Sequence, residues 1–241
     1  SLLLRRLELK DSARARELYT LATKLDPKYP GAWGGVAWTH LLAARFGWST
    51  SPAASLSKAE ELARKALELD ANRPGTYILL GHIYLTKGDH DLAVTFGEKS
   101  VELSPSGAEA LAILAVTYSY IGQPKRAIGL LRKAMRLSPY YPGYYLWALG
   151  RAYRLTGDHG RAISAFTQHL KRDPGSLVSR VEIVTTHAEL GRMAEAREAA
   201  KAVLRIAPNF STRKWARSLT YKDRAVIERE IAALRKAGLP E

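Results

Sequence analysis

The stretch LGHIYLTKGDHDLA, residues 80–93, contains the pattern that decides the fold of this chain. Its Gly88 recurs three times, at intervals of 34, 35 and 34 residues, and each glycine is followed five positions later by an alanine. The glycines are Gly88, Gly122, Gly157 and Gly191, and the alanines are Ala93, Ala127, Ala162 and Ala196. A fixed period of this length indicates an array of stacked repeats rather than a globular enzyme.

Other positions keep the same period. Tyrosines precede the first three glycines by four residues, and His187 takes that place in the fourth repeat. A small or apolar residue lies three positions before each of these, and a proline closes each unit. In chain order these positions hold Tyr84, Tyr118 and Tyr153; Gly81, Ala115, Gly150 and Val184; and Pro105, Pro139, Pro174 and Pro208. The glycine is expected to end a first helix, and the small residues allow a second helix to approach it closely.

The pattern Tyr77, Leu80, Gly81, Tyr84, Ala93 and Pro105 resembles the tetratricopeptide (TPR) repeat, a helix-turn-helix unit of about 34 residues. The resemblance implies an all-α fold, a right-handed α-α superhelix of antiparallel helix pairs. We predict a truncated repeat or cap over 1–29, a repeat over 30–73 with a lengthened turn at about 45–55, repeats over 74–107, 108–142, 143–176 and 177–210, and capping helices over 211–241.

Both ends of the chain depart from the regular unit. The first repeat has room only for a short first helix, Leu2 to Lys10, and the chain starts on Ser1 rather than methionine, so we expect a piece of a longer protein. In the last segment the charged residues Arg224, Glu228, Arg229, Glu230, Arg235 and Lys236 alternate with apolar ones. That alternation predicts a terminal helix with a polar outer face.

Composition restricts the possible functions. The chain has no cysteine, which excludes disulfides, thiolate chemistry and zinc fingers. It opens without a signal peptide, and no apolar run reaches the length of a membrane span, so we predict a cytoplasmic module without a membrane segment. No phosphate-binding loop, dinucleotide motif or nucleophile elbow is present, and the histidines lack metal-ligand spacing. We therefore expect no catalytic residue, no cofactor, no metal and no enzymatic activity in this piece.

The net charge of +14 is the first feature that indicates a partner. Basic residues on repeat helices usually serve solvation, but a basic stripe is also typical of polyanion binding. The tightest cluster is Arg213, Lys214, Arg217, Lys222 and Arg224, which makes nucleic acid the alternative partner.

The first helices of such repeats line the groove of the superhelix, where peptides or partner helices bind. Helical spacing from the small-residue positions predicts that Trp38, His82, Tyr120, Tyr144, Trp147, Arg151 and Arg154 face this groove. Aromatic side chains beside paired arginines favour a peptide with acidic or apolar residues. The competing interpretation is that about half of these aromatics pack between helices. Gly34, Trp38 and Leu79 stand where a chaperone-binding carboxylate clamp would need lysine and asparagine, so that clamp is missing.

A narrower resemblance lies in the irregular parts. The segments AWTH (37–40), FGWS (46–49), YKD (221–223) and LRKAGLP (234–240) resemble the C-terminal TPR region of bacterial class III adenylate/guanylate cyclase-like proteins. This implies a regulatory or localising module behind an N-terminal signalling domain. The sequence thus predicts a non-catalytic module that binds a protein or peptide, which could be another domain of its own chain. A polyanion-binding module and a self-associating scaffold (a homo-oligomer) are the alternatives.

Overall fold

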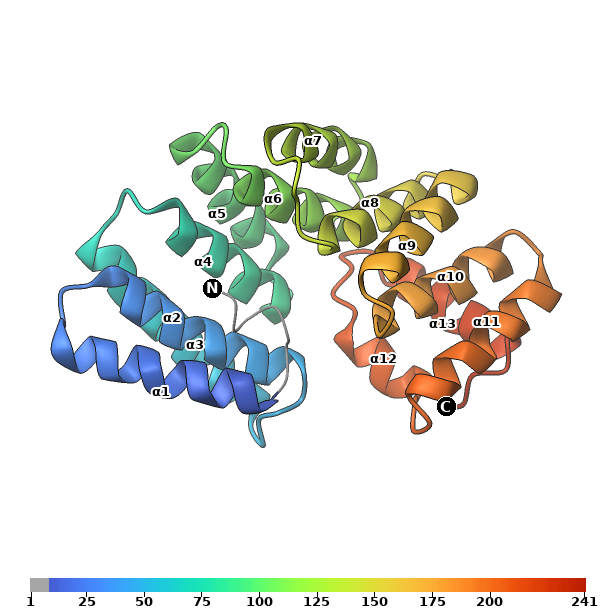
Figure 1. Ribbon diagram of the computed structural model, residues 1–241, viewed down its shortest axis with the longest axis horizontal. Coiled ribbons are helices and arrows are strands. Elements are labelled where there is room, and N and C mark those ends of the chain that lie inside the picture. Colours follow the sequence, from blue (N-terminus) through green and yellow to red (C-terminus); the bar gives the residue numbers. More distant parts are fainter. Residues whose placement is uncertain (1–8) are drawn as a thin grey trace. The chain divides into compact units, whose positions relative to one another are not determined.

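The structure, a computed structural model, describes residues 9–241 and is built of α-helices throughout that range (Figure 1). Residues 2–8 of the helix expected at Leu2 to Lys10 are outside the described part, and its last two residues, Leu9 and Lys10, belong to α1. The helices are α1 Leu9–Leu25, α2 Pro30–Arg45, α3 Pro52–Leu69, α4 Pro74–Lys87, α5 His90–Leu103, α6 Ala108–Tyr120, α7 Pro124–Leu137, α8 Tyr144–Leu155, α9 His159–Arg172, α10 Leu177–Glu189, α11 Met193–Ile206, α12 Thr212–Ser218 and α13 Arg224–Lys236.

The chain divides into two compact units, one up to Pro105 and one from Ser106 onward. In the first unit α1 packs on α2, and the pairs α2–α3 and α4–α5 follow. The second unit contains the pairs α6–α7, α8–α9 and α10–α11, with α13 packed on α10 and α12. Within each unit the helices alternate as the first and second members of antiparallel pairs, which confirms the all-α repeat class.

The recurring glycines end the first helices in the left-handed conformation. Gly157 has φ +79°, and the other three lie between +73° and +81°. The backbone N–H of the next residue, Asp158, donates to the carbonyl of Tyr153 at 2.9 Å, a bond that closes the last turn of α8. An L side chain is disfavoured at this φ, which explains why the position is always glycine. The Asp158 side chain then caps α9 by accepting from the backbone N–H of Arg161.

The lengthened repeat uses the same turn. Gly47, at φ +68°, ends α2, and the Trp48 N–H donates to the Ala43 carbonyl at 2.9 Å. Residues 46–51 link the helices, whereas 52–55 already belong to α3, which is 18 residues long against 14 for α5. Part of the extra sequence around Trp48 therefore lengthens a helix instead of enlarging the loop.

Small residues bring the paired helices close together. A Cβ added at Gly150 would lie 2.6 Å from the Phe166 ring of α9, so no larger residue fits there without rearrangement. The alanines five residues after the turns, including Ala162, are fully buried. These contacts form the core of each helix pair.

Two of the recurring tyrosines, Tyr153 and Tyr84, connect successive repeats. The Tyr153 hydroxyl accepts from Arg132 of α7, in the preceding repeat, at 2.8 Å, and the Tyr84 hydroxyl meets Glu60 and Arg64 of α3. Burial opposes ionisation of Glu60, but hydrogen bonds from Lys87, Tyr84 and Arg64 outweigh it and lower its pKa to about 2.

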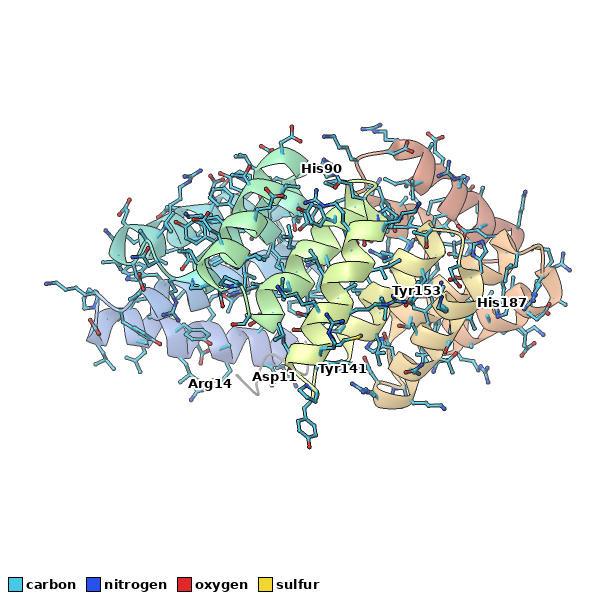
Figure 2. The ribbon with its side chains drawn as sticks, turned by 90° about the horizontal axis from the view of Figure 1, so that it is seen from above. Asp11, Arg14, His90, Tyr141, Tyr153 and His187 are labelled. Atoms are coloured by element: carbon cyan, nitrogen blue, oxygen red, sulfur yellow. The ribbon has the colours of Figure 1, made fainter. Side chains whose placement is uncertain are left out.

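His187, the tyrosine's substitute in α10, has no such link: its Nδ1 has no hydrogen-bond partner among the described residues. Tyr153 and His187 are labelled in Figure 2. His187 thus occupies the position of the recurring tyrosines, but it lacks the hydroxyl through which Tyr84 and Tyr153 contact the preceding repeat.

The same substitution should have opposite effects at two glycines of one helix pair. Gly157→Ala puts a side chain in the left-handed region and should lower the free energy of unfolding by about 1 kcal/mol. Gly160→Ala, in the exposed first turn of α9, should raise it by up to about 1 kcal/mol because alanine favours the helix. Urea denaturation measures both, and two shifts of the same sign would contradict the assigned turn.

Candidate functional site

The first helices α6, α8 and α10 of the second unit pack side by side and form one surface, which we call the first-helix face. Five of the residues predicted to line the groove lie on α6 and α8 of this face. They are Tyr120, Tyr144, Trp147, Arg151 and Arg154.

Two arginines one helical turn apart form the centre of the face. Arg151 and Arg154 are 2% and 4% exposed, and both donate through Nε to the carboxylate of Glu182 on α10, at 2.6 Å and 2.9 Å. Glu182 is itself fully buried. A carboxylate that receives two guanidinium groups fixes the rotation of α10 relative to α8.

The end of α10 and the C-terminal segment supply the remaining partners of Arg154. Arg154 donates through Nη2 to Glu230 of α13 at 2.6 Å and through Nη1 to Glu189 at 2.7 Å. The second oxygen of Glu230 accepts from the Trp215 indole of α12 at 2.9 Å. Glu230 is 1% exposed, so both of its carboxylate oxygens are bound inside the protein. The helix α13 thus lies on the first-helix face.

Aromatic rings surround Arg151. Its guanidinium carbon lies 4.3 Å from the centre of the Trp147 ring, 4.9 Å from that of Tyr120 and 5.7 Å from that of Tyr221. The Tyr120 and Tyr221 rings are 4.8 Å apart, and the backbone N–H of Lys222 donates to the Tyr120 carbonyl at 2.9 Å. Such cation–π contacts stabilise a buried guanidinium. They also hold the loop before α13 against the end of α6.

The pKa shifts in this cluster follow from burial and from which charged groups lie next to each other. Burial disfavours charge on both carboxylates, but Arg151 and Arg154 together outweigh it at Glu182 and lower its pKa. Burial dominates at Glu230, which has Arg154 on one side and Glu182 nearby, and raises its pKa. Burial would also lower the pKa of Arg154, but the carboxylates, Glu182 first, raise it well above its ordinary value. Two buried arginines and two buried glutamates leave the centre of the face balanced in charge.

The other predicted groove residues are in different surroundings. In the first unit, Trp38 of α2 meets His82 of α4 edge to face, with ring centres 5.3 Å apart. His82 is buried, and burial together with Arg45 lowers its pKa to about 3, so the ring is neutral. Tyr144 and Trp147 are half-buried on α8, and the Trp147 indole N–H has no hydrogen-bond partner in the part of the chain that the structure describes.

The predicted basic patch lies on the surface of the second unit. Arg213, Lys214 and Arg217 are exposed on α12, and Lys222 and Arg224 are exposed at the start of α13. Arg213 approaches Glu241 at 3.8 Å, with both side chains more than half exposed. Exposed pairs of this kind are worth little, so the patch keeps its positive character.

One expectation about the terminal helix was wrong. Glu230 was assigned to its polar outer face, but it points inward, between Ile227, Ile231 and Leu234. These four residues fall at positions i, i+3, i+4 and i+7, which places Glu230 on the apolar side of the helix. Glu182 has the same signature, an acid within the apolar stretch of α10. A carboxylate inside an apolar helical stripe is the signal that could have found the partners of the two arginines.

Two other features of the described residues bear on function. Residues 9–241 contain no group of three acidic or histidine side chains placed to hold a metal ion. Within the same range, the helices are too short or too polar to cross a lipid bilayer.

The paired helices, the left-handed glycine turns and the contacts between repeats define a helical-repeat scaffold protein. Three family models, each described as tetratricopeptide repeat, match residues 74–106, 114–176 and 153–217. The chain is therefore a tetratricopeptide-repeat protein over these residues. Repeats of this family bind protein partners, which agrees with the prediction of a protein-binding module.

Similar proteins support the same class. The BBSome complex member BBS4 of Bos taurus is 37% identical over 82 residues, which are 34% of this chain and 16% of that protein. The chain therefore spans less than a fifth of this curated relative. The crystal structure of the APC/C hetero-tetramer Cut9–Hcn1 aligns with a TM-score of 0.74 at 19% identity, over 95% of this chain and 40% of that one. YrrB, described as a TPR protein with an unusual peptide-binding site, aligns with a TM-score of 0.50 at 22% identity, over 81% and 95%.

The carboxylate of Glu230 should be essential for seating α13. Glu230→Gln leaves Arg154 with one fewer buried countercharge, and we expect the free energy of unfolding to fall by about 3 kcal/mol. Glu228→Gln, two residues away on the exposed side, should change it by less than about 0.5 kcal/mol. Thermal and urea denaturation compare the two variants, and equal losses would show that Arg154 does not need this partner.

Proposed function

We propose that this chain is a non-catalytic protein-interaction module that binds a peptide or helix of a partner protein through the first helices of its repeats. The observation that supports this is the way α13 lies on the first-helix face. The face receives a carboxylate, Glu230, on Arg154 and a tyrosine, Tyr221, against Tyr120 and Arg151. A surface that holds one acidic and aromatic segment has the chemistry to recognise another of the same kind.

Burial separates the predicted groove residues into those that build the face and those that can contact a partner. Arg151 and Arg154 are buried and bound to their own chain, so their contribution is to build the face. Trp38, Tyr144 and Trp147 keep part of their surface exposed, and large aromatics of this kind dominate interface energies. We propose that Tyr144 and Trp147 in the second unit and, separately, Trp38 in the first unit, where it packs on His82, are contact points for a partner.

The wider context is also a proposal. We propose that the module regulates or localises a domain joined to its N-terminal side in the cytoplasm, cyclase-like by the resemblance of its irregular segments. The similarity to a BBSome complex member favours a role in a protein assembly. None of the relatives described above is a cyclase, so the kind of domain rests on the short resembling segments alone.

A second candidate function rests on the basic patch. Arg213, Lys214 and Arg217 project from one short helix, and Lys222 and Arg224 follow in the chain, all exposed. A cluster of this charge density attracts polyanions such as nucleic acid. The two candidates use different surfaces and can be tested separately.

Replacing the exposed tryptophans tests the protein-binding proposal. Trp38→Ala and Trp147→Ala should each reduce capture of partner proteins from a cell extract about tenfold or more, because each removes a large contact surface. Trp33→Ala is the matched control: Trp33 is also on α2 and half-buried, but its indole donates to the Pro27 carbonyl at 2.9 Å, away from His82. Circular dichroism checks that the helices remain. Capture that is equally strong with all three variants would refute the role of this surface.

The polyanion candidate predicts binding that depends on salt. Affinity for a DNA duplex should fall linearly on a log–log plot with salt concentration, and Lys214→Glu with Arg217→Glu should reduce both the affinity and the slope. Arg197→Glu with Lys201→Glu on α11 changes the net charge equally, at exposed positions outside the patch. Fluorescence anisotropy distinguishes them. If both double variants lose affinity to the same extent, the patch has no specific role.

A further inference from the structure

The first described helix, α1, exposes an apolar face. It packs on α2 through Ser12 and Ala15, which are 5% and 3% exposed. Leu18, Leu21 and Leu25, which lie on one side of the helix at positions i, i+3 and i+7, are 43%, 52% and 78% exposed. Three leucines exposed along two turns of one helix form a contiguous apolar patch, and such patches mark contact surfaces.

Comparison with the equivalent positions shows that this exposure is unusual. The buried Ala15 corresponds to Ala59, Ala93, Ala127, Ala162 and Ala196, the alanines of the other second helices. Six positions further on, α1 has Leu21, where those helices have Lys65, Lys99, Lys133, Gln168 and Ala202. Three positions after the alanine, Leu18 corresponds to Leu62, which is only 6% exposed. The face of α1 thus has the composition of a contact surface.

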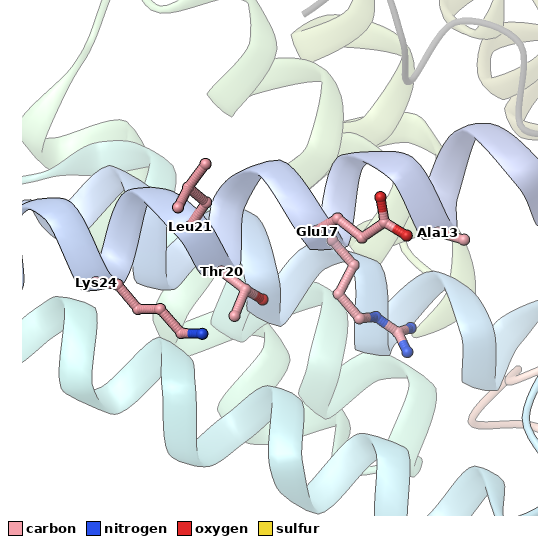
Figure 3. A pocket seen from close by; sticks show the side chains of 6 residues that line it. Ala13, Glu17, Thr20, Leu21 and Lys24 are labelled. Atoms are coloured by element: carbon pink, nitrogen blue, oxygen red, sulfur yellow. The ribbon is translucent and has the colours of Figure 1, made fainter.

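The same face is hollowed and carries two opposite charges. Ala13, Glu17, Thr20, Leu21 and Lys24, with Arg16, line a shallow surface hollow along the helix (Figure 3). Glu17 and Lys24 are seven residues apart, two turns of helix, and therefore lie on one line with Thr20 and Leu21 between them. Glu17 also pairs with Arg14 at 2.9 Å, both largely exposed, and Arg16 is engaged by Thr39 of α2 at 3.0 Å.

We propose that the α1 face is the interface of a symmetric homodimer, in which α1 of a second copy lies antiparallel on it. A two-fold axis between Thr20 and Leu21 places Glu17 of each copy opposite Lys24 of the other. The interface is then complementary to itself in charge, as a two-fold contact must be. Leu21 of both copies is buried near the axis, and Leu18 and Leu25 flank it. This goes beyond the proposed function, because it assigns a different surface and a second copy of this chain as the partner.

The first test replaces Leu21 with lysine, the residue at three of the five equivalent positions. Leu21→Lys should leave the thermal stability of the monomer unchanged, because the side chain is half exposed, and should weaken dimerisation at least about tenfold. Leu137→Lys on α7 is the control, since Leu137 is 45% exposed and lies outside the interface. Sedimentation of the full chain over a range of concentrations measures both. A wild-type chain that stays monomeric up to about 100 µM overturns the proposal, as does equal weakening by both variants.

The second test uses the symmetry of the charges. Because each substitution occurs twice in a dimer, Glu17→Lys alone and Lys24→Glu alone should each weaken dimerisation at least about tenfold. The two together exchange the charges and should restore the dissociation constant to within about threefold of wild type. A double variant no better than the single ones contradicts the antiparallel register. Partner capture by the first-helix face should be unaffected in all of these variants, which separates this proposal from the proposed function.

Discussion

The repeats of this protein depend on a chain reversal that only one residue type performs without strain. Each first helix ends where Gly88, Gly122, Gly157 or Gly191 takes a positive φ and the next backbone N–H returns to the carbonyl five residues back. Since this turn fixes the direction of the second helix, small residues of the first helix lie against the second one: a Cβ added at Gly81 would lie 3.4 Å from the Ala93 carbonyl oxygen, and one at Gly150 would meet the Phe166 ring. The position of a single residue thereby sets the geometry of a whole helix pair.

This dependence explains which parts of the fold the sequence could predict. The turn is local, so its glycine, the capping Asp158 and the buried Ala162 could be assigned from spacing alone. The lengthened repeat was harder, because the extra residues between Gly47 and Ala59 could enlarge a loop or extend a helix. Pro52, which favours the first turn of a helix, is the residue that decides it, and α3 begins there.

The candidate site could be predicted only in part, because its contacts are not local. Helical spacing predicted one surface for Tyr120, Trp147, Arg151 and Arg154, and the structure brings the Tyr120 and Trp147 rings to Arg151. Spacing carries no information about what covers that surface. The partners of Arg154 come from 28 to 76 positions further along the chain, Glu182 and Glu230 among them. Only the placement of an acid within an apolar helical stripe indicated that each would turn inward.

The ionic cluster determines the position of α13 more than it adds to the free energy of its packing. Buried ion pairs gain little over well-packed apolar residues, because desolvation of both charges offsets their attraction. Ile231, Leu234 and Leu239 already bury α13 and the residues after it against α10 and α11. Apolar contacts of this kind tolerate small rotations and shifts, whereas a carboxylate held by Arg154 and Trp215 at the same time tolerates almost none. Tyr221 adds a second fixed point at the end of α6. The contacts of Glu230 with Arg154 and Trp215 thus fix the position of α13 on the first-helix face more closely than apolar packing alone does.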